Sequence, residues 1–88
     1  MGSPEIPDDA LGDDLAQLVG LLVDEPEDLN LREEIGRSGD RVFKVEVPEH
    51  DLGKLIGRQG RTARSLRAFL ETRGKLDGRR YALEILEV

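Results

Sequence analysis

The sequence predicts one α+β domain in which a three-stranded sheet packs against helices, with its elements in the order αββααβ. Three observations predict this class: an amphipathic helix pattern near the N-terminus, two alternating segments around a glycine-rich turn, and two helical segments that flank a glycine loop before a last alternating segment. The 88 residues suffice for one small domain with a single core. Because only one Tyr and two Phe are present, Leu, Ile and Val must supply most of the burial.

The N-terminal segment divides into a tail and a helix. Residues 1–9 hold two prolines and three acids, so we expect a disordered acidic tail there and a folded domain over residues 10–88. Apolar residues between Leu11 and Val23 recur at the three- and four-residue spacing of an amphipathic helix. Pro26 stops such a helix, so the pattern predicts a helix over residues 10–24.

A hairpin is predicted next. Residues 29–35 alternate weakly between apolar and polar positions, and residues 36–40 have the composition of a turn, Gly-Arg-Ser-Gly-Asp. Residues 41–47 alternate clearly, and Pro48 ends the segment. Two alternating segments around a glycine-rich turn are typical of paired antiparallel strands.

The C-terminal half predicts two helices and a strand. A short helix covers residues 50–57, and a second helix follows the glycine loop over about residues 61–72. Residues 74–78 contain two glycines and an aspartate, which favour a turn. The segment 79–88 then alternates and carries apolar residues on both parities, which indicates a strand buried on part of both faces.

The helix over residues 61–72 has two different faces. On a wheel of roughly 100° per residue, its apolar side chains fill one arc, which is expected to pack on the sheet as core. The large members of this arc are Leu66, Phe69 and Leu70. The opposite arc, which is expected to stay in water, carries Arg61, Arg64 and Arg67.

Charge is distributed unevenly along the chain, although the net charge is −6. Residues 1–40 carry 12 acids and two arginines, whereas residues 41–80 carry 11 lysines and arginines and five acids. A basic segment of this kind favours nucleic-acid binding more than the overall charge disfavours it. The chain has no cysteine, which excludes disulfides and thiolate metal sites. We find no membrane-spanning run and no secretory signal, and therefore expect a cytoplasmic protein.

The loop Gly57-Arg58-Gln59-Gly60 is the strongest functional signal. Glycine allows a sharp turn and a close approach to a ligand, because it has no Cβ. The helix that follows adds a positive dipole and unpaired N–H groups, which together favour an anion such as phosphate. The alternative is a tight helix–helix turn with no binding role.

The loop and its surroundings resemble a known family. Residues 55–61, Leu-Ile-Gly-Arg-Gln-Gly-Arg, are similar to the I-G-x-x-G loop of KH domains, which lies between two helices. The order αββααβ matches the bacterial type II KH arrangement. Together with the short length and the N-terminal helix, the sequence resembles the small bacterial single-KH RNA-binding proteins, the KhpA family. The resemblance covers about residues 10–88.

The resemblance implies a binding site for single-stranded RNA. KH domains hold about four nucleotides, with the loop backbone against phosphates. It implies that the loop residues 57–60 form the phosphate clamp, and that bases lie in an apolar groove beside it. The implied flanking phosphate contacts are Lys54, Arg61 and Arg64. The implied groove residues are Leu55 and Ile56, with Val45 and Val47 from the neighbouring strand.

Several assignments around this site stay open. Arg67 either contacts phosphate or pairs with Glu71, and Arg79 and Arg80 either bind RNA or simply flank a strand end. Almost no aromatic residue is available to stack bases, and such stacking supplies about 1–3 kcal/mol per base where it exists. Binding is therefore expected to be electrostatic, moderate and tolerant of sequence.

Two functions are compatible with this reading. The first is an RNA chaperone or post-transcriptional regulator. The second is a dimerisation or adaptor module, because the resemblance implies a homodimer or a heterodimer with a larger KH-containing protein of the Jag/KhpB type. Candidate interface residues lie around Ala68 and Thr72 on the second helix.

The sequence does not support an enzyme, and we expect neither a cofactor nor a metal. The single histidine, His50, lies between two acids, Glu49 and Asp51. General acid–base or metal chemistry would need a nucleophile or a third ligand, and none accompanies it. Capping of the short helix by Glu49 or Asp51 is the better explanation of this cluster.

Overall fold

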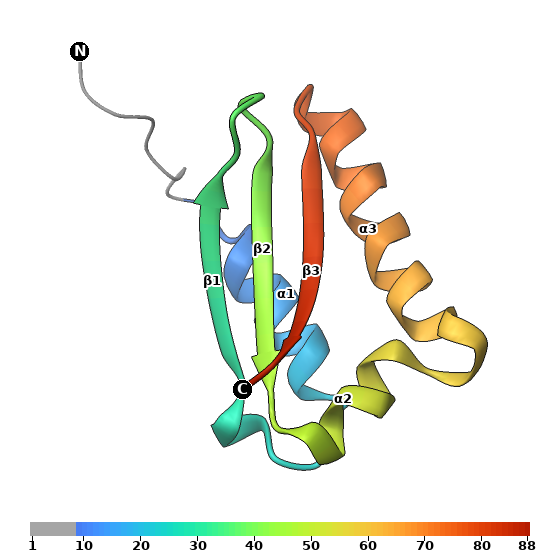
Figure 1. The fold of residues 1–88 in the computed structure, drawn as a ribbon. Helices are drawn as coiled ribbons and strands as arrows, with labels where there is room; N and C mark the ends of the chain where they lie inside the picture. Colours follow the sequence, from blue (N-terminus) through green and yellow to red (C-terminus); the bar gives the residue numbers. More distant parts are fainter. Residues whose placement is uncertain (1–8) are drawn as a thin grey trace.

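The structure is a computed structural model, and it describes residues 9–88. Its order of helices and strands is the predicted one (Figure 1). In chain order the elements are α1 (Leu11–Gly20), a 3₁₀ turn (Pro26–Asp28), β1 (Asn30–Ile35), β2 (Arg41–Val47), α2 (Glu49–Ile56), a second 3₁₀ turn (Arg58–Gly60), α3 (Arg61–Asp77) and β3 (Tyr81–Glu87). The predicted tail, residues 1–9, lies outside the described residues apart from Asp9. In residues 9–88 no helix has the length and apolar character needed to cross a membrane.

The three strands form one mixed sheet in the order β1-β2-β3. The predicted hairpin is confirmed, because β1 and β2 pair antiparallel with Leu31 opposite Val45. β3 pairs parallel to β2, with Leu83 beside Phe43. A parallel neighbour requires a crossover, and α2 and α3 provide it.

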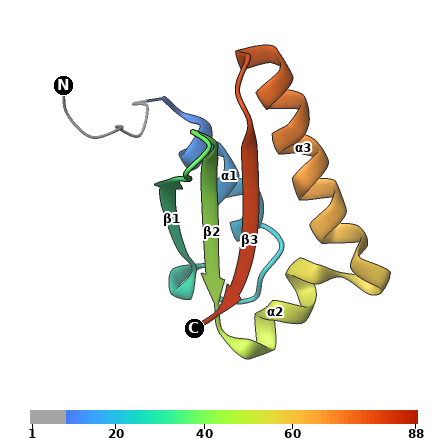
Figure 2. The same ribbon diagram turned by 45° about the horizontal axis from the view of Figure 1, so that its top comes forward.

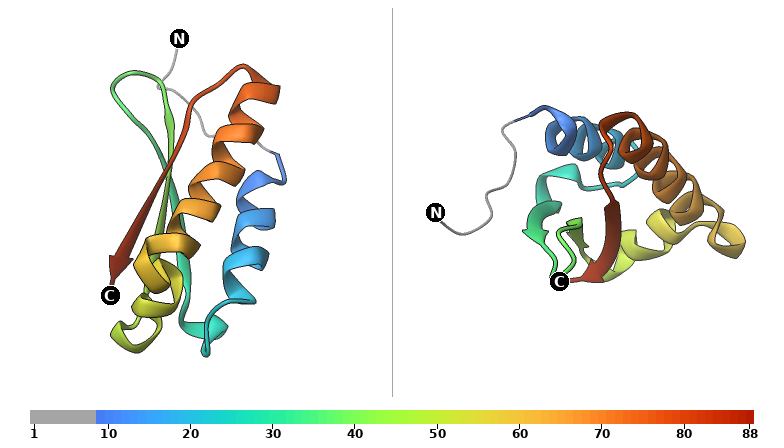
Figure 3. Two further views of the ribbon diagram at one scale, coloured as in Figure 1. Left: turned by 90° about the vertical axis from the view of Figure 1, so that its right-hand side faces the viewer. Right: turned by 90° about the horizontal axis from the view of Figure 1, so that it is seen from above.

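The helices α1 and α3 cover one face of the sheet, and α2 lies near the end at which β2 finishes (Figures 2 and 3). The core lies between these layers, and its fully buried side chains come from both the sheet and the helices. They include Leu11, Leu15, Phe43, Val45, Val47, Leu55 and Leu70. Alternate residues of β2 point into this core, which explains the clear apolar period of residues 41–47.

A buried arginine ties the N-terminal end of the domain to the sheet. Arg41 is 3% exposed, and its guanidinium donates to Asp9 at 2.9 and 3.0 Å and to Glu33 at 3.0 and 3.2 Å. It also lies 4.8 Å from the ring centroid of Phe43. The hydrogen bond from Arg41 lowers the pKa of Asp9. Two carboxylates thus compensate one buried charge at the start of β2.

A buried carboxylate holds the turn after α1. Asp51 is fully buried and accepts hydrogen bonds from the backbone N–H groups of Asp24 at 2.9 Å and Glu25 at 3.2 Å. These bonds lower its pKa. The predicted capping of the short helix is wrong, because Pro48 is the N-cap of α2 and no side chain caps it. Asp51 instead satisfies donors that lie far away in the sequence.

Two helix ends differ from the predictions. α1 ends at Gly20 rather than at residue 24, and the chain turns so that Leu21 is exposed. α3 continues to Asp77, beyond the predicted end at residue 72. Gly74 lies inside this helix rather than in a turn, because the chain after α3 folds back against it. A Cβ on Gly74 would lie 2.5 Å from the carbonyl oxygen of Arg79.

Phe69 was predicted to be core, but it is 36% exposed. Leu66 and Leu70 are buried as predicted. Phe69 lies at the margin of the apolar arc, on the side of α3 that is turned away from its arginines. The arc is wider than the surface that the sheet covers, so its outer member stays partly in solvent.

The close approach at Gly74 predicts a specific loss of stability. We expect Gly74→Ala to raise the free energy of the folded state by about 1–3 kcal/mol, because the new Cβ must displace backbone. Gly53→Ala is the matched control, since Gly53 is also helical and has open space around it. This control is expected to stabilise the protein by about 0.5–1 kcal/mol. Urea unfolding measures both variants, and equal effects would contradict the packing argument.

The ion pairs of Arg41 predict a pH dependence. A carboxylate whose pKa is lowered on folding adds stability above its ordinary value of 3.8, and this stability is lost as the pH falls through the lowered pKa. We therefore expect Asp9→Asn to lower the Tm by a few degrees at pH 7, and expect the difference from wild type to shrink below about pH 4. Glu87→Gln, which removes an exposed acid at the end of β3, is the control and should leave the Tm at pH 7 nearly unchanged. A deficit of Asp9→Asn that is the same at pH 3 and pH 7 would contradict the role of this ion pair.

Candidate nucleic-acid interface

The glycine loop joins α2 to α3 in a tight left-handed turn. Gly57 has φ 78° and ψ 169°, and Gly60 has φ 74° and ψ 14°. A Cβ on Gly57 would lie 2.8 Å from the backbone nitrogen of Thr62. Gln59 between them also has a positive φ of 57°. The backbone conformation of the loop therefore favours glycine at both positions. A helix–helix turn with no binding role and a phosphate clamp would both use this same conformation.

The turn uses some of its own donors. Gly60 N–H donates to Gly57 O at 3.0 Å, and Arg61 N–H donates to Arg58 O. The N–H groups of Arg58 and Gln59 take part in neither bond. The sequence predicted several free donors at the loop, and this turn reduces the expected set to those two and the N–H groups that follow Arg61 in the first turn of α3.

Arginine side chains of the loop and of the first two turns of α3 form a continuous basic edge. Arg58, Arg61, Arg64 and Arg67 are exposed, and in residues 9–88 no carboxylate lies within 4.0 Å of any of their guanidinium nitrogens. Arg61 donates instead to the side chain of Gln59 at 3.3 Å. Glu71, the alternative partner of Arg67, lies 3.8 Å from Lys75. The charge of this edge is therefore available to an anionic ligand.

Lys54 differs from the arginines, because it already has a partner. Its Nζ donates to Asp24 Oδ2, and this hydrogen bond raises the pKa of Lys54. The Asp51 carboxylate fixes the backbone that carries Asp24. The Lys54 ammonium has two further N–H donors, so Lys54 keeps its candidate role as a phosphate contact beside Asp24.

The expected groove residues are mostly not at the surface. Val45, Val47 and Leu55 are at most 1% exposed, so they form the core and not a groove floor. Ile56 is 42% exposed beside the loop and keeps its candidate role. The correction follows from the topology, because β2 is the central strand of the sheet and β3 is the strand beside α3.

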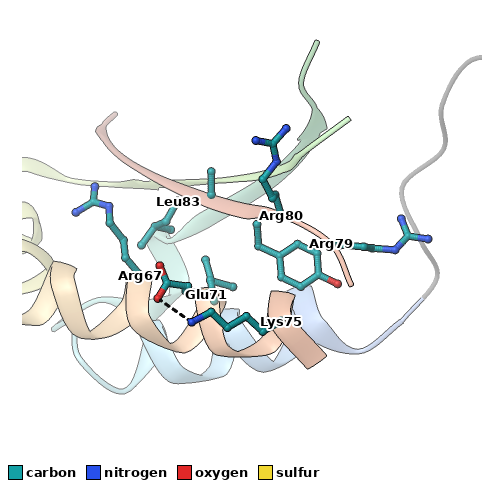
Figure 4. A pocket seen from close by; sticks show the side chains of 9 residues that line it. Arg67, Glu71, Lys75, Arg79, Arg80 and Leu83 are labelled. Carbon is teal, nitrogen blue, oxygen red and sulfur yellow. Dashed lines mark ion pairs between the residues drawn. The ribbon is translucent and has the colours of Figure 1, made fainter. Parts of the chain in front are cut away.

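A hollow of about 490 Å³ lies between α3 and β3 (Figure 4). Its volume is within the range of about 300–1,000 Å³ for ligand pockets. Its apolar lining is supplied by Leu70, Ala82 and Leu83 and by the ring of Tyr81. Its charged rim consists of Arg67, Glu71, Lys75, Arg79 and Arg80.

The hollow contains residues that the sequence analysis gave no firm role. Arg79 and Arg80 do precede β3, as the strand-end alternative stated, and they also line the hollow. Lys75 and Tyr81 were not considered as site residues. The feature that could have indicated these two residues is the parallel crossover, because it brings the start of β3 beside the last turns of α3. Tyr81 supplies an aromatic ring, and its hydroxyl donates to Asp77 Oδ2 at 2.6 Å.

The element order, the mixed sheet and the glycine loop between two helices are those of a type II KH fold. The chain belongs to the KhpA/KhpB KH-domain family, because the model of that domain matches residues 12–85.

Several proteins of the family are similar over most of this chain. The RNA-binding protein KhpA of Streptomyces coelicolor is 42% identical over 74 residues, which cover 84% of this chain and 89% of that protein. The RNA-binding protein KhpA of Chlamydia trachomatis is 37% identical over 73 residues, covering 83% and 92%.

A solved structure shows a similar fold in a larger protein. Era, in complex with MgGDPNP and nucleotides 1506–1542 of 16S ribosomal RNA, aligns with a TM-score of 0.55 at 19% identity. The alignment covers 99% of this chain and 35% of Era, so this chain corresponds to about a third of that one. At this identity the likeness concerns the fold alone.

Proposed function

We propose that this protein binds single-stranded RNA and acts in the cytoplasm as an RNA chaperone or post-transcriptional regulator. The observation that carries the proposal is the unpaired basic edge of α3, which begins at the glycine loop and leads to the α3–β3 hollow. Phosphates bind at residues 57–60 and at Arg61 and Arg64, and bases lie toward Ile56 and the hollow. The KhpA relatives, which are named RNA-binding proteins, support this reading.

The proposed binding is mainly electrostatic. An RNA that follows α3 from the loop toward the hollow would also meet Arg79 and Arg80. For single strands, log K falls with log salt by about 0.7 per phosphate contact. Tyr81 is the one aromatic ring among the residues that line the hollow, so stacking contributes at a single position at most.

The loop is tested by Arg58→Asp combined with Gln59→Asp. We expect the affinity for a single-stranded RNA octamer to fall at least tenfold at 0.1 M salt, because two repulsive charges replace a cation at the clamp. Aspartate tolerates the positive φ of position 59, so the fold should be retained. Fluorescence anisotropy measures the affinity, and circular dichroism checks the fold.

A matched control variant lowers the net charge by the same amount as the loop variant, but at positions outside the basic edge. Arg32→Asp combined with Gln17→Asp alters two exposed positions of β1 and α1, outside the basic edge. We expect it to weaken binding only slightly. If the loop variant is folded and binds RNA like this control, the loop is not the phosphate clamp.

A second function, pairing with another KH protein, is favoured by an apolar groove on the other side of α3. The groove has a volume of about 300 Å³ and is lined by Leu18 and Leu22 of the α1 region and by Thr62, Ser65 and Leu66 of α3. Phe69 follows on the same side and is exposed. Exposed apolar side chains gathered in one place favour a protein contact.

We propose that this groove forms a homodimer, or a heterodimer with a larger KH-containing protein of the Jag/KhpB type. Ala68 and Thr72 are exposed on α3, and they remain candidate interface residues. The groove and the basic edge lie on opposite sides of the helix. One assembly can therefore present two RNA-binding loops, which raises avidity.

The pairing surface is tested by Phe69→Asp. We expect wild-type protein to sediment as a dimer at high micromolar concentration and the variant to sediment as a monomer, because a charge cannot be buried unpaired at an interface. Val88→Asp, which changes another exposed apolar residue, is the control and should remain a dimer. A monomeric wild type at that concentration would rule out the homodimer.

A further inference from the structure

Nearly all the charged side chains at the rim of the α3–β3 hollow are hydrogen-bond donors. Arg67, Lys75, Arg79 and Arg80 carry donors and no acceptor. Glu71 is the one carboxylate among the residues that line the hollow. The Tyr81 hydroxyl is already engaged with Asp77. A ligand in this hollow therefore finds many donors for phosphate and one strong side-chain acceptor.

Glu71 is placed to meet a ligand in the hollow. It lies one helical turn after Arg67 and one turn before Lys75, so the three side chains share one face of α3 (Figure 4). The Glu71 carboxylate lies 3.8 Å from Lys75 Nζ, which is an ion pair but longer than a hydrogen bond. In residues 9–88 its oxygens accept no side-chain hydrogen bond, and the side chain is 74% exposed. Within the described residues, its oxygens are therefore open to solvent and to a ligand.

A carboxylate is an unexpected group at a phosphate-binding surface. It repels the RNA backbone, so a surface that only attracts phosphates gains nothing from it. A carboxylate can, however, accept a hydrogen bond from the exocyclic amino group of a base, as acidic side chains do with cytosine N4. Uracil has a carbonyl oxygen at the same position, and that oxygen would meet the carboxylate as a second acceptor.

We propose that the α3–β3 hollow is a nucleobase site in which Glu71 selects cytosine or adenine over uracil. The base lies on the apolar lining of Leu70, Leu83 and Tyr81, and Arg67, Arg79 and Arg80 contact the phosphates beside it. This proposal rests on the RNA-binding function proposed above. It adds a choice between bases to the RNA-binding function, which by itself gives no preference for a base.

The test compares two RNA octamers, one of cytidines and one of uridines, by fluorescence anisotropy at 0.1 M salt and neutral pH. A good contact to a base edge discriminates by about 1–3 kcal/mol, which corresponds to a ratio of affinities between roughly 5 and 150. We expect wild-type protein to prefer the cytidine octamer by about tenfold. Glu71→Ala should bring the ratio close to one, with binding of the uridine octamer unchanged or tighter because a negative charge is removed.

Two control variants separate base selection from other effects of Glu71. Glu84→Ala removes one negative charge from a residue that lies outside the hollow and near Lys44, and it should keep the ratio. Lys75→Ala breaks the ion pair but leaves the carboxylate, so it should weaken binding of both octamers and keep the ratio. If Lys75→Ala and Glu71→Ala remove the preference equally, Glu71 acts only through its ion pair, and the proposal is wrong.

The remaining outcomes are also decisive. A wild-type protein that binds both octamers equally would overturn the base selection and leave the RNA-binding function intact. A folded Glu71→Ala that keeps the wild-type ratio would remove Glu71 from the site. A wild-type protein that binds neither octamer would contradict the RNA-binding function itself.

Discussion

The parallel pairing of β2 with β3 is the constraint on which the rest of the structure depends. A parallel neighbour cannot be reached by a hairpin, so the chain must cross the sheet through α2 and α3. The crossover places the glycine loop beyond one end of the sheet and aligns α3 with β3. The basic edge, the hollow and the loop lie on one surface because these two elements run beside each other.

The distribution of ion pairs explains how an acidic protein can present a basic site. Many of its acids have partners within the fold: Asp9 and Glu33 meet Arg41, Asp51 accepts from backbone, and Asp24 pairs with Lys54. The four arginines of the basic edge have no such partners in residues 9–88, whereas Arg73, further along α3, pairs with Asp77. The potential at the loop is therefore set by nearby unpaired arginines, since exposed charges beyond about 10 Å are largely screened at 0.1 M salt.

Local patterns predicted the local structure, and topology decided the rest. The bounds of β2 follow from its alternation and from Pro48, and the glycine loop follows from two residues that must have positive φ. Gly74 looked like a turn residue, because a sequence cannot show that a glycine is needed for close packing inside a helix. Val45 and Val47 were expected in a groove because alternation separates core from surface but does not say which strand lies beside α3.

The helix α3 has a core side, a side that borders the hollow and a side with exposed Phe69, and this arrangement connects the two proposed functions. One side, with Leu66 and Leu70, is fixed in the core, so neither of the other sides can rotate into a different role. Arg67 borders the hollow on one side, and Phe69 is exposed on the other. A partner that covers Phe69 would leave the Arg67 side open to RNA. Since the helix is rigid and continuous from Arg61 to Asp77, such a partner would also fix the distance between two loops and hence the length of RNA that can bind both.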